Sequence, residues 1–353
     1  MTIAPASSQK VSKGTMMERI LASSIYADTR KTQTAYGLVE KPFFIVGSER
    51  SGTTLLRMML DGHPEISCCA EFNYAVDLLS NQGRLPKLSD YYQYLESNRD
   101  FLMDGYKVDR QLDYAELVNS FLKQNSKEAN KAFYGATVHR HFDRILHIWP
   151  NAMFIHLVRD GRDVSQSCID MGWAGNLWYA SDRWIEAEQL WETVSQKLPE
   201  NRKIEVKFEQ LVEDSERTLS SICQLMGTQY HADMLEVYVE QSDYDKPNSK
   251  LAYKWRKRFS NRDIRLVESR IAPLLEARGY VLSGLPAMRI SPLKRVYLYL
   301  HNKTGKFSRR TNEYGLGLVL ADMLSRRIRL ASLQQAVQKR MQIISVRGMK
   351  KGW

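Results

Sequence analysis

The sequence has few cysteines and no long apolar run. Its 353 residues contain four cysteines, Cys68, Cys69, Cys168 and Cys223. Four in a chain of this length do not form a disulfide framework, and their spacing matches no metal-site pattern. No apolar stretch reaches membrane-spanning length, and the N-terminal residues lack the apolar core of a signal peptide. These absences predict a soluble, cytoplasmic protein without a bound metal.

Acidic residues are scarce near the C-terminus. From Met288 to Trp353 the chain has fifteen Lys and Arg against two acids, an excess of +13 within a total net charge of +11. The rest of the chain is therefore close to neutral. A neutral main body argues against a surface built for nucleic acid, so the basic character belongs to the C-terminal segment.

Apolar and amphipathic stretches alternate along the chain. Short apolar runs predict strands at 42–47, 152–158 and 203–208. Helical periodicity predicts helices at 53–61, 113–123, 141–148, 161–171, 178–198, 218–226, 232–240 and 263–277. The alternation favours an α/β fold with a parallel sheet flanked by helices. We expect a leader at 1–40, a main domain at 41–285 and a basic, mainly helical extension at 286–353.

A phosphate-binding loop lacks its lysine. Gly47 and Gly52 have the spacing of the nucleoside triphosphatase loop and Thr54 fits its last position, but Thr53 stands where lysine is expected. The backbone amides and the helix N-terminus still attract an anion. Without the lysine, and without a clear magnesium ligand, we expect an anion of lower charge than a triphosphate, assisted by Arg50.

The loop sequence resembles that of a known family. The stretch 50–56 is similar to the 5′-phosphosulfate loop of sulfotransferases, which use 3′-phosphoadenosine 5′-phosphosulfate (PAPS). Residues 60–65, Leu-Asp-Gly-His-Pro-Glu, resemble the branch containing tyrosylprotein sulfotransferases and many bacterial enzymes, although Glu49 replaces a frequent proline. The resemblance implies a three-layer P-loop NTPase-like fold. It also implies that the donor is bound by Arg50, Ser51, Gly52, Thr53 and Thr54.

A second motif follows the strand at 152–158. Arg159-Asp160-Gly161-Arg162-Asp163 leads to Ser167, and this pattern resembles the family's 3′-phosphate motif. Ser167 lies about two helical turns beyond Arg159, so its hydroxyl can point back to the same anion. A salt-bridged turn without a ligand is the alternative interpretation.

Three weaker resemblances follow, and the likeness covers about residues 41–282. Phe208 stands where the family has a tyrosine near the nucleotide, and Lys254-Trp255 resembles a late motif whose lysine approaches the cofactor. Residues 268–280 resemble the family's closing helix. Ser242 is a candidate for contact with the sulfonate because of its place before Lys254.

The resemblance also suggests catalytic residues. Glu71 lies at the position of the branch's general base, with a solvated or salt-bridged glutamate as the alternative. Thr137 replaces a lysine that neutralises the transferring sulfonate, so His139 or His141 is a candidate for supplying the missing proton or charge, with a histidine in the core or at a helix start as the alternative. His139 and His141 have no third metal ligand in view. Trp173 and Trp178 are candidates for lining the acceptor pocket, within acceptor loops expected at 72–110 and 172–182.

The resemblance implies a sulfotransferase that moves a sulfuryl group from PAPS to a hydroxyl or, less readily, an amine of a small-molecule, carbohydrate or other acceptor. The alternatives are a P-loop kinase and a non-catalytic nucleotide-binding protein whose basic tail binds a membrane or a partner. For the amphipathic stretches at 316–330 and 333–344 three interpretations stay open. These are packing on the main domain, peripheral contact with an anionic membrane, and contact with a second copy of the chain.

Overall fold

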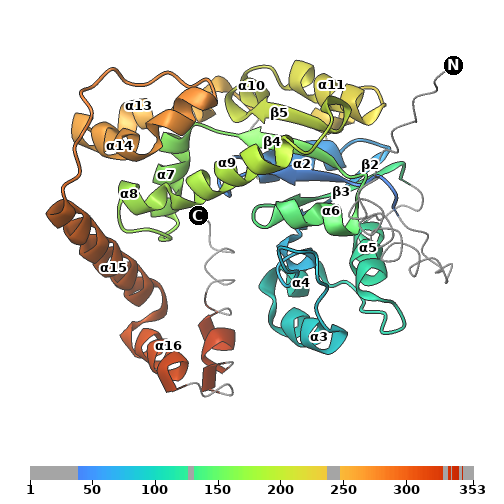
Figure 1. Cartoon of the computed structure of the whole chain (residues 1–353), viewed down its shortest axis with the longest axis horizontal. Coiled ribbons are helices and arrows are strands. Elements are labelled where there is room, and N and C mark those ends of the chain that lie inside the picture. The colour runs from blue at the N-terminus through green and yellow to red at the C-terminus, as the bar shows by residue number, and fades with distance from the viewer. Residues whose placement is uncertain are drawn as a thin grey trace, which may run out of the picture. The chain divides into compact units, whose positions relative to one another are not determined.

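The computed structural model describes residues 39–125, 131–236 and 247–328, and further on 333–334, 336–341 and 344. Its core is a five-stranded sheet with the strand order β2-β3-β1-β4-β5, in which all neighbours are parallel (Figure 1). The strands are β1 (Phe43–Val46), β2 (Ile66–Glu71), β3 (Phe133–Val138), β4 (Met153–Val158) and β5 (Lys203–Lys207).

The central strands are apolar on both faces, which confirms the predicted parallel sheet. Phe43 and Ile45 of β1 pack into one hydrophobic cluster, while Phe44 and Val46 pack into another on the opposite face. Successive side chains of a strand point to opposite faces, so these four residues anchor both helical layers. Every residue of β4 is likewise buried.

The sequence analysis missed β2 and β3. Their sequences, ISCCAE and FYGATV, contain polar or small residues instead of a continuous apolar run. Gly135 has a specific packing role, because a Cβ there would lie 2.5 Å from the ring of Phe43. Strand β3 therefore pairs with β1 at a point where a side chain would not fit.

Helices cover both faces of the sheet. The α-helices of the described residues are α2 (Thr53–Asp61), α3 (Leu88–Ser97), α4 (Arg99–Asp104), α5 (Tyr114–Gln124), α6 (Ile145–Ile148), α7 (Gly161–Asp170), α8 (Leu177–Ala180), α9 (Asp182–Ser195), α10 (Phe208–Glu213), α11 (Ser215–Met226), α13 (Trp255–Arg258), α14 (Asn261–Ala277), α15 (Pro292–Tyr314) and α16 (Leu316–Ile328). Short 3₁₀ turns are η1 (Asn73–Ala75), η2 (Phe142–Arg144), η3 (Glu200–Arg202) and η4 (Ser249–Leu251).

Two predicted helices are corrected by the structure. The stretch 178–198 contains two helices. Asn176 caps α8, which ends at Ala180, and α9 begins at Asp182 after Ser181. The stretch 141–148 begins as the 3₁₀ turn η2 before α6. Of the predicted helix 232–240, residues 237–240 lie outside the described residues.

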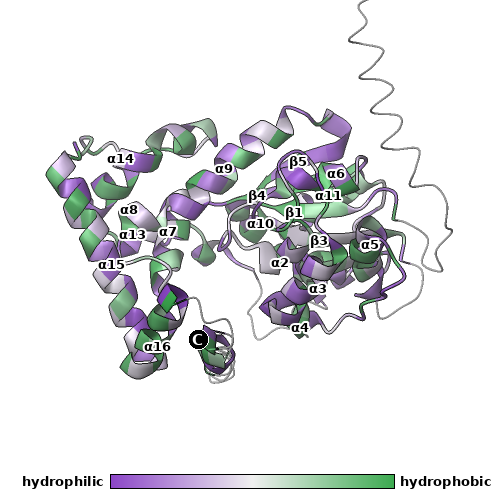
Figure 2. Ribbon diagram, turned by 60° about the horizontal axis from the view of Figure 1, so that its bottom comes forward, coloured by the Kyte–Doolittle hydropathy of each residue, from purple (hydrophilic) through white to green (hydrophobic). Residues whose placement is uncertain are grey.

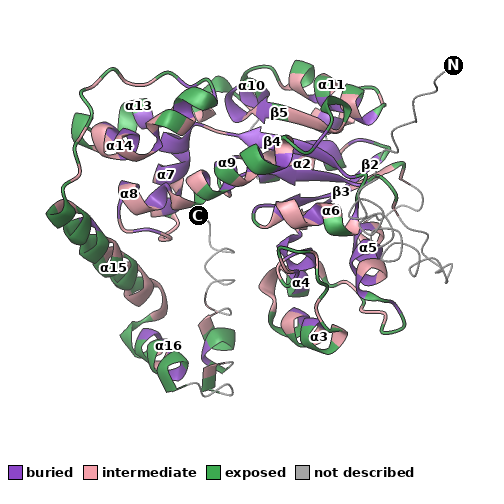
Figure 3. Ribbon diagram, viewed as in Figure 1, coloured by how far each residue is buried: buried purple, intermediate pink, exposed green. Residues whose placement is uncertain are grey.

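The extension contributes two long helices. Ser291 caps α15, whose first residue is proline, a combination that favours a helix start. Helix α15 touches the loop before α8, where the Gly175 amide donates to Asn302 Oδ1 at 2.8 Å. Gly305 also packs closely against this loop, because a Cβ on Gly305 would lie 2.8 Å from the Cα of Gly175. Most of α15 and α16 is exposed (Figure 3). None of the helices in the described ranges combines the length and apolarity needed to cross a bilayer.

Candidate active site

The loop after β1 is shaped by glycines and by one strained arginine. Gly47 has φ 142° and Gly52 has φ 96°, both in the region that favours glycine. A Cβ on Gly52 would lie 2.3 Å from the ring of Phe208, so the loop passes directly against that ring. Arg50 has φ 70°, an uncommon value for a residue with a side chain. The loop thus brings the N-terminus of α2 to the carboxyl end of β1, where its free amides favour an anion.

Arg159 is held in place from several sides. Its guanidinium donates to the carbonyl oxygens of Arg50 at 3.3 Å and Leu251 at 3.1 Å, and it contacts Asp163 Oδ2 at 3.4 Å. It also lies over the Phe208 ring, 4.3 Å from the ring centroid. Its buried Nε has no hydrogen-bond partner among the described residues. A buried guanidinium nitrogen without an acceptor fits a site that receives an anion.

The two motifs meet in one cavity. Arg50 Nε donates to Ser167 Oγ at 2.9 Å, which joins the loop to α7 although the two residues are 117 positions apart. The cavity has a volume of about 420 Å³. Its wall includes these predicted site residues: Arg50, Gly52, Thr53, Thr54, Glu71, His139, Arg159, Ser167 and Phe208.

Two predicted site residues of the described part of the chain are not in that wall. Ser51 is fully buried, and its hydroxyl has no hydrogen-bond partner within the described ranges. Lys254 is exposed, and its backbone amide donates to Asp163 Oδ2 at 3.2 Å, while its side chain does not line the cavity. Ser242 lies outside the described residues.

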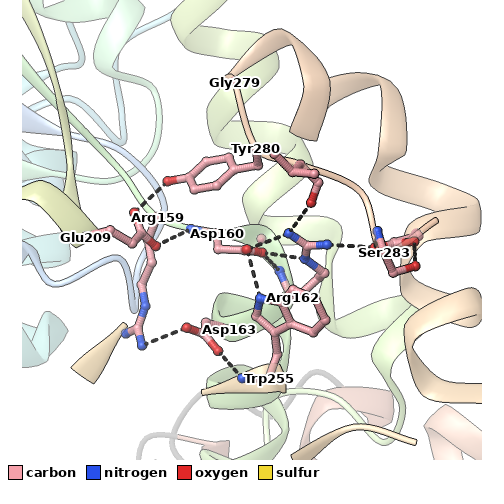
Figure 4. A network of polar contacts seen from close by, with 12 residues as sticks. Arg159, Asp160, Arg162, Asp163, Glu209, Trp255, Gly279, Tyr280 and Ser283 are labelled. Atoms are coloured by element: carbon pink, nitrogen blue, oxygen red, sulfur yellow. Dashed lines mark hydrogen bonds and ion pairs between the residues drawn. The ribbon is translucent and has the colours of Figure 1, made fainter. Parts of the chain in front are cut away.

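A buried network of polar side chains holds the turn that carries Arg159 (Figure 4). Arg162 is 1% exposed and makes hydrogen bonds to Asp160 at 2.9 and 2.7 Å, to Glu268 at 2.7 Å and to the Val281 carbonyl at 3.0 Å. Its guanidinium also lies 3.9 Å from the Trp255 ring centroid. We call Asp160, Arg162, Asp163, Glu209, Trp255, Glu268 and Tyr280 the frame. The frame has four carboxylates against the one guanidinium of Arg162, and hydrogen bonds from backbone amides, the Trp255 indole and the Tyr280 hydroxyl help these carboxylates to lie in the protein interior.

The frame explains the weaker sequence resemblances. Glu209 accepts from the backbone amide of Asp160 at 3.0 Å and from the Tyr280 hydroxyl at 2.8 Å. Trp255 donates from its indole to Asp160 Oδ2 at 2.9 Å and from its backbone amide to Asp163 Oδ1 at 2.7 Å. These residues come from α10, α13 and the segment after α14, and all of them fix the turn that follows β4.

Glu71 and His139 form a pair on the cavity wall. The Nε2 atom of His139 lies 3.1 Å from both carboxylate oxygens of Glu71, and its Nδ1 lies 2.8 Å from the Gly47 carbonyl. The Glu71 side chain is 38% exposed, whereas that of His139 is 2% exposed. Glu71 is therefore the member of the pair that a substrate can reach.

The pair shifts the acidity of both groups. Burial alone would raise the pKa of Glu71, but the charge and hydrogen bond of His139, with a hydrogen bond from Asn73, bring the pKa below its ordinary value of 4.5. Burial would lower the pKa of His139, yet the charge and hydrogen bond of Glu71 raise it above 6.5. The pair therefore favours a carboxylate beside an imidazolium.

Asn73 is a member of this site that the sequence analysis missed. Its Oδ1 accepts from the His139 amide at 2.8 Å, and its Nδ2 donates to Glu71 at 3.3 Å. Thr137, which stands at the position of the family lysine, is buried, and its hydroxyl has no hydrogen-bond partner in the described part of the chain. His139 is therefore the largest source of positive charge acting on the pKa of Glu71, and the charge of Arg57 adds a smaller part.

A second, larger cavity adjoins the first. It has a volume of about 810 Å³. Four residues line both this cavity and the first one: Glu49, His139, Arg140 and Trp173. Glu49 forms an ion pair with Arg183, whose guanidinium lies 4.5 Å from the Trp173 ring centroid. The carboxylate of Glu49, which stands where the family often has a proline, is therefore neutralised by a residue of α9. Asn302 and Lys306 of α15 also line this cavity, and Trp178 does not.

Within the described residues, no three His, Cys, Asp or Glu side chains are grouped as a metal site requires. The cysteines Cys68, Cys69, Cys168 and Cys223 are free thiols and are buried.

The structure is thus an α/β fold with two adjoining cavities, one of which is lined by arginines and the carboxylate of Glu71. A family model described as "Sulfotransferase family" matches residues 42–232, and the chain belongs to this family. It is thus a transferase by family. The match contains both arginine motifs and the Glu71–His139 pair, but ends before Trp255, Tyr280 and the extension.

Sequence relatives point in the same direction. The chain is 24% identical over 223 residues to protein-tyrosine sulfotransferase 2 of Gallus gallus, covering 60% of this chain and 57% of the relative. It is 24% identical over 276 residues to a putative protein-tyrosine sulfotransferase of Caenorhabditis briggsae, covering 69% of this chain and 91% of the relative.

Two solved structures share the fold. The sulfotransferase domain of the Synechococcus PCC 7002 olefin synthase matches with TM-score 0.54 and 20% identity, over 72% of this chain and 99% of that domain. The sulfotransferase domain of the curacin biosynthetic pathway matches with TM-score 0.51 and 16% identity, over 70% of this chain and all (100%) of that domain. The predicted fold class is therefore confirmed.

Proposed function

We propose that the protein transfers a sulfuryl group from PAPS to a hydroxyl of an acceptor molecule. One observation carries the proposal: Arg50, Arg159 and Ser167 line a single cavity at the start of α2, and the carboxylate of Glu71 lies in the same wall. Cationic groups for a phosphorylated donor and a base for a hydroxyl are therefore together. This combination fits group transfer better than nucleotide binding alone.

The donor end is assigned by charge and position. Arg159 and Ser167 would hold the 3′-phosphate, while Arg50 and the first amides of α2 would hold the 5′-phosphosulfate. Phe208 lies against both positions, since its ring contacts Gly52 and Arg159, and Arg50 joins them directly through its hydrogen bond to Ser167 Oγ. The wall residues fit this ligand because two arginines, a hydroxyl and a helix N-terminus all have room to meet an anion.

The reaction would be an in-line displacement in which Glu71 removes the acceptor's proton. The acceptor oxygen would form a bond to sulfur as the bond from sulfur to the leaving phosphate oxygen breaks. Arg50 and the loop amides would stabilise the charge that develops on that phosphate. His139 would keep Glu71 ionised and would supply the positive charge that lysine provides elsewhere in the family.

The adjoining cavity of about 810 Å³ is the proposed acceptor site. It meets the donor cavity at Glu49, His139 and Trp173, beside the proposed base. Its wall mixes acidic, basic and aromatic side chains, which suits a polar hydroxyl-bearing molecule and not a nucleic acid. For the extension, we favour a lipid surface as the partner over a second copy of the chain, because two segments of net charge +13 would repel each other.

Labelled sulfuryl transfer tests the proposal. The purified chain would be incubated with sulfur-labelled PAPS and a fractionated cell extract, with the Glu71→Gln variant run in parallel. We expect label in an extract component with the unaltered chain and very little with the variant. Transfer from labelled ATP with magnesium in place of PAPS would support a P-loop kinase instead. Donor binding without transfer to any fraction would support a non-catalytic nucleotide-binding protein.

A further inference from the structure

The two helices of the extension expose a row of apolar side chains. On α15 these are Leu293, Val296, Leu300 and Phe307, of which Leu300 is 56% exposed. On α16 they are Leu316, Leu320, Met323, Leu324 and Ile328. The α15 residues follow one another at intervals of three, four and seven positions, and those of α16 at four, three, one and four, so each set lies on one face of its helix. Hydrophobic and hydrophilic residues accordingly alternate along both helices (Figure 2). We call the two sets together the apolar stripe.

The stripe is not the face that packs on the main domain. Leu298, the one α15 residue that is buried, and Asn302 and Gly305, which contact Gly175, lie on the side of α15 opposite Leu300. On α16 the buried residues Val319, Asp322 and Ser325 are three positions apart and lie on a different face from the exposed set. The apolar stripe of α15 therefore lies on the side of the helix that the main domain leaves uncovered, and a partner can reach it there.

Basic residues accompany the stripe. Lys303 of α15 and Arg327 of α16 are exposed within or beside it. The segment as a whole has an excess of +13 within a chain of total charge +11. An exposed apolar face with adjacent cations is the pattern of a helix that lies in the interface of an anionic bilayer. A second copy of the chain is less favourable as the partner, because it would bring two such segments together.

We propose that α15 and α16 dock the protein on an anionic lipid surface. The apolar stripe would enter the boundary between headgroups and acyl chains, and the basic residues would contact the anionic headgroups. The inference goes beyond the sulfuryl-transfer proposal and does not depend on it. It concerns residues outside the matched segment 42–232.

Vesicle flotation with the full chain tests docking directly. The probes are vesicles of phosphatidylcholine alone and of phosphatidylcholine with phosphatidylserine, at low and high salt. We expect flotation with the anionic vesicles only, weakened by salt. Removal of one cation, in Lys303→Gln, should weaken partitioning about fivefold, since one basic residue near such a surface contributes about that factor. Absence of flotation with anionic vesicles would overturn the proposal.

A pair of apolar variants separates docking from general attraction of a basic protein. The triple variant Val296→Ser, Leu300→Ser, Phe307→Ser changes exposed positions only, so it should fold, which circular dichroism would verify. We expect it to lose at least tenfold in partitioning. Leu102→Ser is the matched control, because Leu102 is 52% exposed on α4, away from the stripe, and it should float like the unaltered chain.

Two results would contradict the stripe as the contact. Equal flotation of the triple variant and the control would mean that charge alone attracts the protein. A dimer in analytical ultracentrifugation that the triple variant dissociates would assign the stripe to a second copy of the chain. The calorimetric affinity for adenosine 3′,5′-bisphosphate should be the same in all of these variants, which keeps this test separate from the donor site.

Discussion

The wall of the donor cavity and the frame beneath it use the same residue types for opposite purposes. Arg159 and Arg162 are three positions apart, and each has a carboxylate near it. Arg162 is 1% exposed and has its charge matched by Asp160 and Glu268, whereas Arg159 Nε has no partner among the described residues. The comparison shows that Arg162 is paired within the protein, whereas Arg159 keeps one nitrogen without a partner among the described residues, which supports its proposed role in donor binding.

The largest expected effect comes from breaking the frame. Arg162→Met would leave the buried Asp160 and Glu268 without a counter-charge, which costs about 3–5 kcal/mol of unfolding free energy. Urea unfolding measures this. The matched control is Arg258→Met, because Arg258 is 50% exposed and pairs with Asp170 at the surface, where a pair contributes about 0–1 kcal/mol. Equal losses in the two variants would contradict the distinct role of the frame.

A change in the cavity wall should act on chemistry instead of stability. Glu71→Gln removes the proposed base, so turnover should fall at least about a hundredfold while donor affinity stays the same. Asp100→Asn is the control, since Asp100 is another carboxylate of the same wall. If Asp100→Asn abolished turnover and Glu71→Gln did not, the base would be assigned to the wrong residue.

The loop glycine should have an intermediate effect. Gly52→Ala places a Cβ against Phe208 at φ 96°, so the strain of about 1–2 kcal/mol should weaken donor binding about tenfold. Gly227 also has a positive φ, 85°, but no atom lies within 4 Å of the added Cβ. Gly227→Ala therefore shares the backbone strain without the clash, and calorimetry should show unchanged donor affinity.

The smallest expected effect is a change in pH dependence. The pKa of His139 is raised above 6.5, so at low pH its imidazolium keeps Glu71 ionised and adds to the free energy of unfolding. Both contributions are lost as the pH rises through the raised pKa of His139. Turnover should decline about fivefold on the alkaline side, equivalent to ~1 kcal/mol of charge interaction.

Two histidine variants identify the source of that decline. His139→Gln should flatten the alkaline side of the profile, because no titrating imidazole remains beside Glu71. His231→Gln, at an exposed ion pair, should leave the profile of the unaltered chain. The pKa of Glu71 is lowered below 4.5, so loss of its charge should appear only as pH falls through that lowered value. An alkaline decline that persists in His139→Gln would contradict the pairing.

The local parts of the fold and site could be predicted from the sequence. Strands β1, β4 and β5 are short apolar or β-rich runs, and the spacing of Arg159 and Ser167 is set by a single helix. The glycine spacing in the loop is equally local. The family resemblance added Glu71, which no periodicity singles out.

The remaining parts depend on contacts between distant segments. Glu71 and His139 are 68 positions apart, and they meet because β2 and β3 pair with Glu71 opposite Thr137. Both strands were missed, so this pairing could not be predicted. The sequence left a salt-bridged turn as the alternative to a phosphate site at Arg159. The structure contains both features: Arg162 pairs with Asp160 and Glu268, and Arg159 lies 3.4 Å from Asp163 Oδ2 while it also lines the cavity.

The central claim is that Arg159 binds the 3′-phosphate of the same donor that Arg50 holds at its other end. Calorimetric titration of the unaltered chain and Arg159→Ala with adenosine 3′,5′-bisphosphate and with adenosine 5′-monophosphate tests it. We predict that the variant loses about tenfold or more for the bisphosphate, the size of a charge-assisted hydrogen bond, and little for the monophosphate. An equal loss for both ligands, or no loss for either, would contradict the account.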